Sequence, residues 1–189
     1  MSDPLDRDRR RLLHMLRELS FERRSVTLAS GRPSDFYIDC RRTALTAEGH
    51  FLIGRLLWSE IRKNAPEARA VGGMTLGADP LSSSVSLTSY LAGQPLTAFI
   101  VRKEPKGYGT GQWIEGRALL VRGDKVAIVD DVVTSGGSTL KALEHVKEEG
   151  LDPIACFALV DRGEGGREAI EARGVKLHAL YSRADFMGK

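Results

Sequence analysis

The 189-residue sequence has few cysteines, no long apolar run and little net charge. Its two cysteines, Cys40 and Cys156, lie far apart and fit no metal-ligand spacing, so we expect buried or idle thiols in a cytoplasmic protein. No apolar stretch approaches the ~20 residues that a membrane helix needs. The segment Met1–Arg11 also lacks the apolar stretch of a secretion signal. We therefore expect no membrane partner.

Charge of one sign is not in large excess either, since 28 Lys and Arg stand against 25 Asp and Glu. The formal net charge of +3 is too small to indicate a nucleic-acid-binding protein. Positive charge gathers locally, because residues 102–125 hold six basic and three acidic side chains among several glycines. This pattern favours contact with an anion, and a merely solvated surface is the alternative explanation.

Apolar residues make up 42% of the chain, which is enough for one core, and the length fits a single domain. Short, nearly continuous apolar segments predict strands that are covered on both faces, as in a parallel sheet. The expected strands are 96–101, 126–129, 154–160 and 175–181.

Apolar residues at helical spacing predict helices before and between these strands. The expected helices start at Ser2–Pro4, start at Thr46, span 80–91, run through Leu140–Val146 to Gly150, and span 167–173. Alternating strands and helices indicate an α/β fold. The glycine-rich segment 103–116 interrupts this alternation, so we expect a long loop that is functional or disordered.

Residues 126–139 carry the most informative pattern. An apolar strand leads to Asp130 and Asp131, and the hydroxyl- and glycine-rich residues 134–138 then open directly into a helix. Ligands of open α/β sheets bind at such strand ends. Backbone N–H groups, hydroxyls and the helix N-terminus suit a phosphate, while the carboxylates suit sugar hydroxyls or hydrated Mg²⁺. The pattern therefore predicts a sugar-phosphate site.

Two simpler explanations compete with this one. The acid pair could belong to a P-loop nucleotidase, but no Gly-x4-Gly-Lys-Ser/Thr sequence occurs in the chain. It could also be a structural turn with a solvated acid pair, which leaves the hydroxyls and glycines that follow it unexplained. A dinucleotide-binding fingerprint is absent, because Gly107–Gly111 lacks the third glycine and the strand–helix context.

The stretch 126–139 resembles the phosphoribosyl diphosphate (PRPP) motif of type I phosphoribosyltransferases. Three further segments are similar, in the same order, to segments of the orotate phosphoribosyltransferase family. Thr27–Asp39 resembles the base-binding segment, Val101–Gly111 the mobile catalytic loop, and Val160–Arg162 the strand end whose arginine faces orotate. Four motifs in order identify this family more specifically than the PRPP motif alone.

The resemblance implies one domain over 1–189 with a central, mostly parallel sheet flanked by helices. A small N-terminal hood at about 1–45 and a mobile loop at about 103–116 complete the fold expected for this family. It also implies transfer of a phosphoribosyl group from PRPP to orotate, giving orotidine 5′-monophosphate and pyrophosphate in pyrimidine biosynthesis. Mg²⁺ would be held through PRPP and water rather than by direct protein ligands, and a homodimer would share its active sites.

The resemblance assigns roles to particular residues. The catalytic residues would be Lys103, Asp130 and Asp131. The PRPP-binding residues would be these three with Arg102, Lys106, Tyr108, Val132, Val133, Thr134, Ser135, Gly136, Gly137 and Ser138. The orotate-binding residues would be Thr134, Arg162, Tyr37 and Ile38. The turn Gly72–Pro80 resembles the pyrophosphate loop, with Thr75, Leu76, Gly77 and Ala78 at its centre, and a plain strand-to-helix connection is the alternative.

The chain departs from the family pattern at two positions. Ala29 stands where many members carry lysine, and Tyr108 stands where many carry histidine, so one anion contact is missing or supplied from elsewhere. The four histidines lie outside the matching segments, and we expect surface or helix-packing roles for His14, His50, His145 and His178. Trp113, next to the loop, is expected to pack at its hinge.

Two other functions compete with this one. A purine or uracil base could replace orotate, but Arg162 argues against it because a cation beside the base suits an anionic one. A regulator could keep the phosphate site without catalysis, but it would have no need of Lys103 and Lys106.

Overall fold

The computed structural model describes residues 3–24, 26–27, 33–105 and 112–187. Its centre is a six-stranded sheet with the order β10-β9-β8-β5-β6-β7. The strands are β5 (Ala70–Met74), β6 (Thr97–Val101), β7 (Ile114–Glu115), β8 (Lys125–Val133), β9 (Asp152–Asp161) and β10 (Lys176–Ser182). Neighbouring strands are parallel except β7, which is antiparallel to β6. The expected α/β fold with a mostly parallel sheet is confirmed.

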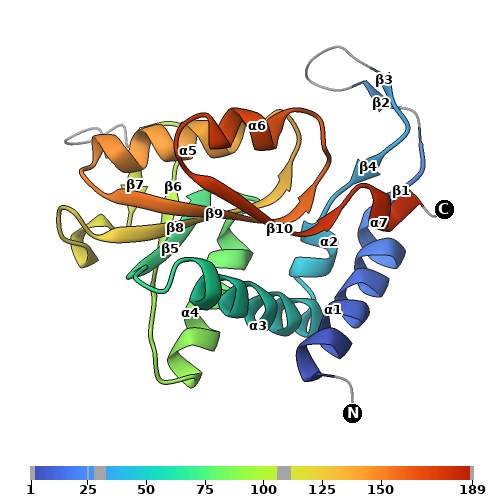
Figure 1. Cartoon of the computed structure of the whole chain (residues 1–189), viewed down its shortest axis with the longest axis horizontal. Coiled ribbons are helices and arrows are strands. Elements are labelled where there is room, and N and C mark those ends of the chain that lie inside the picture. Colours follow the sequence, from blue (N-terminus) through green and yellow to red (C-terminus); the bar gives the residue numbers. More distant parts are fainter. Residues whose placement is uncertain (1–2, 25, 28–32, 106–111, 188–189) are drawn as a thin grey trace.

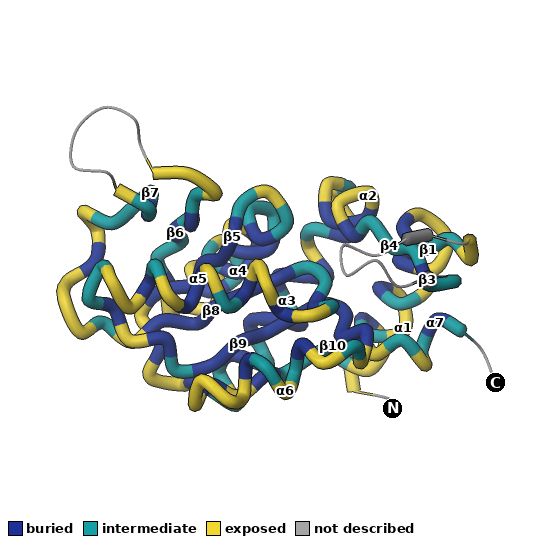
Figure 2. Tube along the Cα trace, turned by 90° about the horizontal axis from the view of Figure 1, so that it is seen from above, coloured by how far each residue is buried: buried dark blue, intermediate teal, exposed yellow. Residues whose placement is uncertain are grey.

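Helices cover both faces of this sheet (Figure 1). On one face lie α5 (Gly137–Glu148) and α6 (Gly166–Glu171), and on the other lie α3 (Ala47–Asn64) and α4 (Asp79–Leu91). Two clusters of buried apolar side chains fill the spaces between the layers. Figure 2 shows β8 and β9 buried between partly exposed helices, which explains why their sequences are almost continuously apolar.

The hood lies beside one edge of this sandwich. It contains α1 (Pro4–Met15), a π-helical turn (Leu16–Ser20), β1 (Phe21–Glu22), β2 (Val26–Thr27), β3 (Pro33–Ser34), β4 (Tyr37–Ile38) and α2 (Arg41–Ala44). Asp3 caps α1 by accepting a hydrogen bond from the Leu5 N–H at 3.0 Å. The C-terminal helix α7 (Ala184–Met187) joins the hood, because the ring of Phe186 contacts those of Phe21 and Phe36 at 5.6 Å each. Nothing in the sequence pattern indicated this contribution from the C-terminal segment.

Three sequence expectations need correction. Gly72 and Gly73 lie inside β5, a central strand that the apolar pattern missed, so only residues 75–78 form the turn before α4. A Cβ atom on Gly73 would lie 2.0 Å from the Val129 carbonyl oxygen, so the residue must be glycine at this close approach. Strand β8 continues past 129 to Val133, because its ladder with β9 continues to that residue.

The third correction concerns the expected loop 103–116. Ile114 and Glu115 form β7, and Arg102 N–H donates to the Trp113 carbonyl oxygen at 2.8 Å, so the loop has a paired base. A short 3-10 helix (Arg117–Leu119) follows it. Among the described residues, no helix is long and apolar enough to cross a membrane.

Candidate active site

The carboxyl ends of β5 and β8 meet at the point where the strand order reverses. From β5 the chain continues to β6 on one side, and it then returns to β8 on the other side. Such a switch point opens a crevice beyond the strand ends, where open α/β sheets bind their ligands. Here the crevice lies between the turn at 75–78 and the turn at 134–136.

Asp130 and Asp131 project from opposite faces of β8. Side chains alternate along a strand, and here Ile128 packs in the cluster with α5 whereas Val129 packs in the cluster with α3 and α4. Continuing this alternation places Asp130 on the α5 face and Asp131 on the face of the hood and the 75–78 turn. The two neighbouring carboxylates therefore serve different sides of one crevice.

Asp130 is held firmly against α5. Its side chain accepts a hydrogen bond from the Thr139 hydroxyl at 2.6 Å and another from the Asp131 N–H at 3.0 Å. The residue is only 7% exposed. Burial, and then the neighbouring charge of Asp131, raises the pKa of Asp130 to about 7.

Asp131 lies in a more polar setting. It accepts a hydrogen bond from the Val132 N–H at 3.0 Å, and burial raises its pKa while the nearby Arg41 guanidinium works in the opposite direction. The turn of Gly77 comes very close, because a Cβ atom there would lie 2.4 Å from the Asp131 Oδ1. A larger residue at position 77 would therefore displace the Asp131 carboxylate from its place beside the 75–78 turn.

Residues 134–138 form the turn that leads into α5, which we call the cradle. Gly136 has a φ of +80°, a conformation that favours glycine, and Gly166 N–H braces the turn by donating to the Thr134 carbonyl oxygen at 3.0 Å. A Cβ atom on Gly166 would lie 2.5 Å from Val133, so this glycine, which the motif did not indicate, is required by packing. The first N–H groups of α5 have no acceptor within the helix and point toward an incoming anion.

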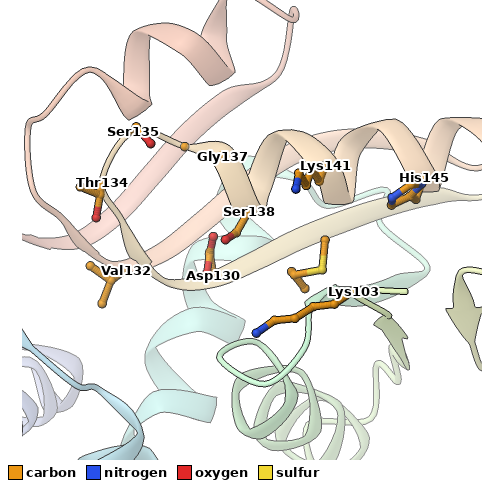
Figure 3. Close-up of a pocket in the computed structure, with 11 residues that line it drawn as sticks. Lys103, Asp130, Val132, Thr134, Ser135, Gly137, Ser138, Lys141 and His145 are labelled. Atoms are coloured by element: carbon orange, nitrogen blue, oxygen red, sulfur yellow. The ribbon is translucent and has the colours of Figure 1, made fainter. Parts of the chain in front are cut away.

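A cavity of about 490 Å³ opens beside this cradle (Figure 3). Its lining residues are Met74, Lys103, Asp130, Val132, Thr134, Ser135, Gly136, Gly137, Ser138, Lys141 and His145. The cavity combines a helix N-terminus, hydroxyls and two lysines, which is the donor set that a phosphate requires.

A second cavity, of about 360 Å³, lies on the other side of the carboxylates. It is lined by Tyr37, Ile38, Asp39, Arg41, Met74, Thr75, Leu76, Gly77, Lys103, Asp130, Asp131, Val132 and Ser138. Thr75 donates its hydroxyl to Asp79 at 2.7 Å, which ties the turn to the start of α4. Lys103 is exposed and borders both cavities, so its ammonium can reach an anion in either.

Arg162 lies outside both cavities, against the hood. Its guanidinium donates to the Ser34 hydroxyl at 3.0 Å, pairs with Glu164 at 2.8 Å and lies 5.1 Å from the centre of the Phe36 ring. The side chain is nearly buried, and its Nε has no acceptor among the described residues. This Nε–H group could donate a hydrogen bond to an acidic ligand that binds beneath the hood.

Several residues assigned from the resemblance do not project into either cavity. The side chain of Val133 is 1% exposed and packs in the core, and Ala78 is also buried, so only their backbone atoms can face a ligand. Arg102 pairs with Glu115 at 2.8 Å and, with Lys103, lines a neighbouring hollow. Lys106 and Tyr108, together with Ala29, lie outside the described residues.

Other residues that line the cavities were not assigned from the sequence. Asp39 and Arg41 enter the second cavity from the hood, where they pair at 2.8 Å; Asp39 ends the segment that resembles the base-binding segment, and no sequence signal marks Arg41. Lys141 and His145 line the first cavity, and their spacing of three and seven residues from Ser138 places all three on one helix face. That spacing was a usable signal, because α5 itself was predicted.

The histidines otherwise occupy packing or surface positions, as expected. His178 stacks on Phe157 with ring centres 5.3 Å apart, and His14 lies 3.3 Å from Glu18. His145 departs from the expectation by also lining the cavity, where its ring stacks on Trp113 at 3.7 Å. Trp113 therefore packs at the base of the loop.

The side chains of the site can be compared with those that a metal ion requires. Among the described residues, no group of three or more His, Cys, Asp or Glu side chains could hold a metal ion by itself. The available donors are carboxylate oxygens, and the buried Asp79 Oδ1 near the 75–78 turn accepts no hydrogen bond from the residues that the structure describes. Oxygen donors of this kind suit Mg²⁺, which keeps water and takes substrate phosphate oxygens as further ligands. The residues present therefore fit Mg²⁺ held jointly with a phosphorylated substrate.

The fold and this site define a phosphoribosyltransferase of type I, and comparison with known proteins agrees. Residues 54–177 match the family model described as the phosphoribosyl transferase domain. The orotate phosphoribosyltransferase of Sorangium cellulosum is 51% identical over 180 residues, covering 95% of this chain and 93% of that protein. The enzyme of the same name from Aquifex aeolicus is 42% identical and covers 85% of each chain.

Solved structures show the same likeness. Mycobacterium tuberculosis orotate phosphoribosyltransferase in complex with Fe(III) dicitrate superimposes with a TM-score of 0.82 at 38% identity, covering 96% of this chain and 99% of that one. The same enzyme in complex with PRPP gives a TM-score of 0.77 at 37% identity, covering 95% and 98%. The chain belongs to the orotate phosphoribosyltransferase family.

Proposed function

We propose that this chain transfers the 5-phosphoribosyl group from PRPP to orotate, giving orotidine 5′-monophosphate and pyrophosphate in pyrimidine biosynthesis. One observation carries the proposal: two cavities at the end of β8 share Asp130, Lys103 and Ser138. PRPP carries a phosphate at one end of its ribose and a diphosphate at the other. The cradle at 134–138 suits the first group, the 75–78 turn suits the second, and the carboxylates between them suit the ribose hydroxyls.

The chemistry follows from this placement. Departure of pyrophosphate leaves positive charge on the ribose, and negative charge develops on the leaving oxygen. Lys103 offsets the charge on the leaving group, while Asp130 and Asp131 fix the sugar by accepting hydrogen bonds from its hydroxyls. Fixing the sugar from both ends orients its anomeric carbon toward the base.

The base would lie beneath the hood, beside Tyr37 and Ile38. Arg162 would recognise the carboxylate of orotate, since its Nε has no acceptor in the described part of the chain and a guanidinium pairs with a carboxylate through two parallel hydrogen bonds. Thr134 follows β8 and is adjacent to the backbone contact between Arg162 N–H and the Val133 carbonyl oxygen, at 2.9 Å. It can therefore serve both the base and the phosphate.

Mg²⁺ is part of the proposal. When bound with PRPP, it would neutralise charge on the diphosphate, and Asp131 would hold its water ligands. The contact between Gly77 and Asp131 supports this placement, because it brings the diphosphate turn to the carboxylate. Chelation of divalent cations should abolish activity, and added Mg²⁺ should restore it.

A base screen tests the reaction. Each base is added singly with PRPP and Mg²⁺, and pyrophosphate release is followed. Orotate should react, whereas uracil and purines should not. Arg162→Lys should raise the KM for orotate at least tenfold and leave the KM for PRPP nearly unchanged, because lysine lacks the planar guanidinium that can donate two parallel hydrogen bonds to a carboxylate. Loss of stability with an unchanged KM for orotate would make Arg162 a structural residue.

We also propose a cytoplasmic homodimer, one domain per chain, in which the loop at about 103–116 serves the neighbouring site. An exposed apolar surface supports dimerisation: a groove between α3 and α4 includes Leu45, Phe51, Leu87 and Leu91, the first and last being 75% and 76% exposed. Apolar surface of this kind marks protein interfaces. The free, buried thiols of Cys40 and Cys156 suit a reducing compartment.

Mixing two variants of strongly reduced activity tests the shared site. Lys103→Ala and Asp131→Asn would disable different halves of each site in the homodimer. Subunit exchange would then create heterodimers with one doubly disabled site and one intact site, so about half of their sites should work. In the single chain Lys103 borders both cavities of its own site, so if exchange is demonstrated by mass and activity does not return, Lys103 serves its own subunit.

A further inference from the structure

The cavity beside the cradle contains a lysine that the reaction described above does not use. Lys141 projects from α5 into the space that also holds Ser135, Gly137 and Ser138 (Figure 3). We propose that Lys141 is a further substrate-binding residue, which contacts the 5-phosphate of PRPP and of the nucleotide product. The inference rests on the proposed function, because it assigns a phosphate of that substrate to this cavity.

The position of Lys141 on α5 directs its ammonium toward the cradle. It follows Ser138 by three residues, so both side chains share one face of the helix. Helical side chains incline toward the helix N-terminus, and the N-terminus of α5 is the cradle itself. In Figure 3 the nitrogen of Lys141 lies on the side of Ser138, across the cavity from Lys103.

Lys141 is also a cation that is available for a ligand here. It is exposed and forms no ion pair with any of the described acidic residues. His145, one turn further along α5, is already engaged, because its ring stacks on Trp113 and lies 3.0 Å from Glu148. An unpaired ammonium beside a helix N-terminus and several hydroxyls completes a site for a dianion.

The lining of the two cavities decides which phosphate Lys141 contacts. Lys141 lines the cradle cavity and does not line the cavity of the 75–77 turn, whereas Lys103 lines both. The diphosphate of PRPP belongs with the turn, so Lys141 serves the opposite end of the substrate. The two lysines thus contact opposite ends of the substrate. Lys141 contacts the 5-phosphate, which remains on the ribose, and Lys103 contacts the diphosphate, which is the leaving group.

Binding measurements with two fragments of the substrate test this assignment. Ribose 5-phosphate carries only the 5-phosphate of PRPP, and pyrophosphate represents only its diphosphate leaving group. By calorimetric titration, Lys141→Ala should bind ribose 5-phosphate about tenfold more weakly, the loss expected for one charge-assisted hydrogen bond. Its affinity for pyrophosphate should stay within about twofold, and Lys141→Arg should retain most of the binding.

Lys147→Ala is the matched control. Lys147 is an exposed lysine on the same helix that lines neither cavity, so its removal changes the net charge equally without touching the ligand. This variant should bind both fragments like the wild type. The KM for PRPP should rise about tenfold in Lys141→Ala only, with the KM for orotate unchanged.

The inference and the proposed function fail in different ways. If the wild type makes nucleotide from orotate and PRPP while Lys141→Ala keeps its affinity for ribose 5-phosphate and its KM for PRPP, the inference alone is overturned. It is also overturned if Lys147→Ala loses as much affinity as Lys141→Ala. If Lys141→Ala loses ribose 5-phosphate binding but the wild type makes no nucleotide, the proposed function fails and the phosphate contact remains.

Discussion

The two sides of the β8 strand end are built differently. On the α5 side, every residue that lines the cavity except Met74 and Lys103 comes from one stretch of sixteen residues, 130–145. On the hood side, Asp131 meets residues from 37–41, from the 75–77 turn and from Lys103. A contiguous site is readable as a motif, whereas a site assembled from separate segments exists only after the sheet and the hood have folded.

The two sides also differ in electrostatics. Asp130 is buried and fully engaged with Thr139 and the backbone, and its pKa lies near 7. Asp131 has a guanidinium nearby, which works against the rise that burial causes. Ligand-free Asp130 is therefore a carboxyl that gains a proton readily, and a bound cation or sugar would favour its ionised form.

Removing either carboxylate should produce the largest effect. Asp130→Asn and Asp131→Asn should each lower kcat/KM for PRPP by about 10- to 100-fold, because each loses a charge-assisted hydrogen bond worth roughly 1.5–3 kcal/mol. Steady-state kinetics with PRPP as the varied substrate measures this, and circular dichroism checks the fold. If both variants had the kinetics of the wild type, neither carboxylate would contact the substrate.

A smaller effect should appear in the stability of the protein, whose dependence on pH should reflect the buried Asp130 on the α5 side. Burial raises the pKa of Asp130 from 3.8 to about 7, so between these values the folded chain holds a proton that the unfolded chain releases. Stability of the ligand-free protein should therefore be greatest at low pH within this window and fall as the pH rises through about 7.

Asp130→Asn removes this titration while keeping a group that can bond to Thr139. The variant should be more stable than the wild type at pH 8, by about 1–3 kcal/mol, and should lose most of that advantage at pH 4. Urea unfolding at both pH values measures the difference. A wild type that gains stability relative to Asp130→Asn as the pH rises would show that Asp130 is ionised and stabilised in the fold.

The smallest effect should come from the far end of the α5 side. His145→Ala removes the stack on Trp113 and should lower the free energy of unfolding by about 0.5–1.5 kcal/mol. Orotate KM should not change, since His145 lies away from the hood. His14→Ala, at an exposed position on α1, is the control and should leave stability nearly unchanged. Equal losses in the two variants would mean that the stack contributes nothing specific.

Sequence reasoning predicted most of the fold because its signals are local. Thr46 caps α3 as expected, and the apolar segments at 96–101, 154–160 and 175–181 are strands. Strand β5 was missed because Gly72 and Gly73 carry no apolar side chain, and their role is to admit neighbouring backbone and ring atoms. That requirement appears only when β5 lies between β6 and β8.

The α/β class could be predicted from the sequence, and so could the place of the two carboxylates and the glycine-rich turn at the end of one strand, because these depend on apolar periodicity and on neighbours along the chain. Only the packed molecule shows that Asp130 and Asp131 face opposite sides of β8 and that Gly77 approaches Asp131. The same is true of the position of Arg41 in the second cavity and of the contact between Arg162 and Ser34 of the hood. The physical reason is that strand pairing and helix packing bring these groups together across separations of tens of residues. No local propensity encodes such distances.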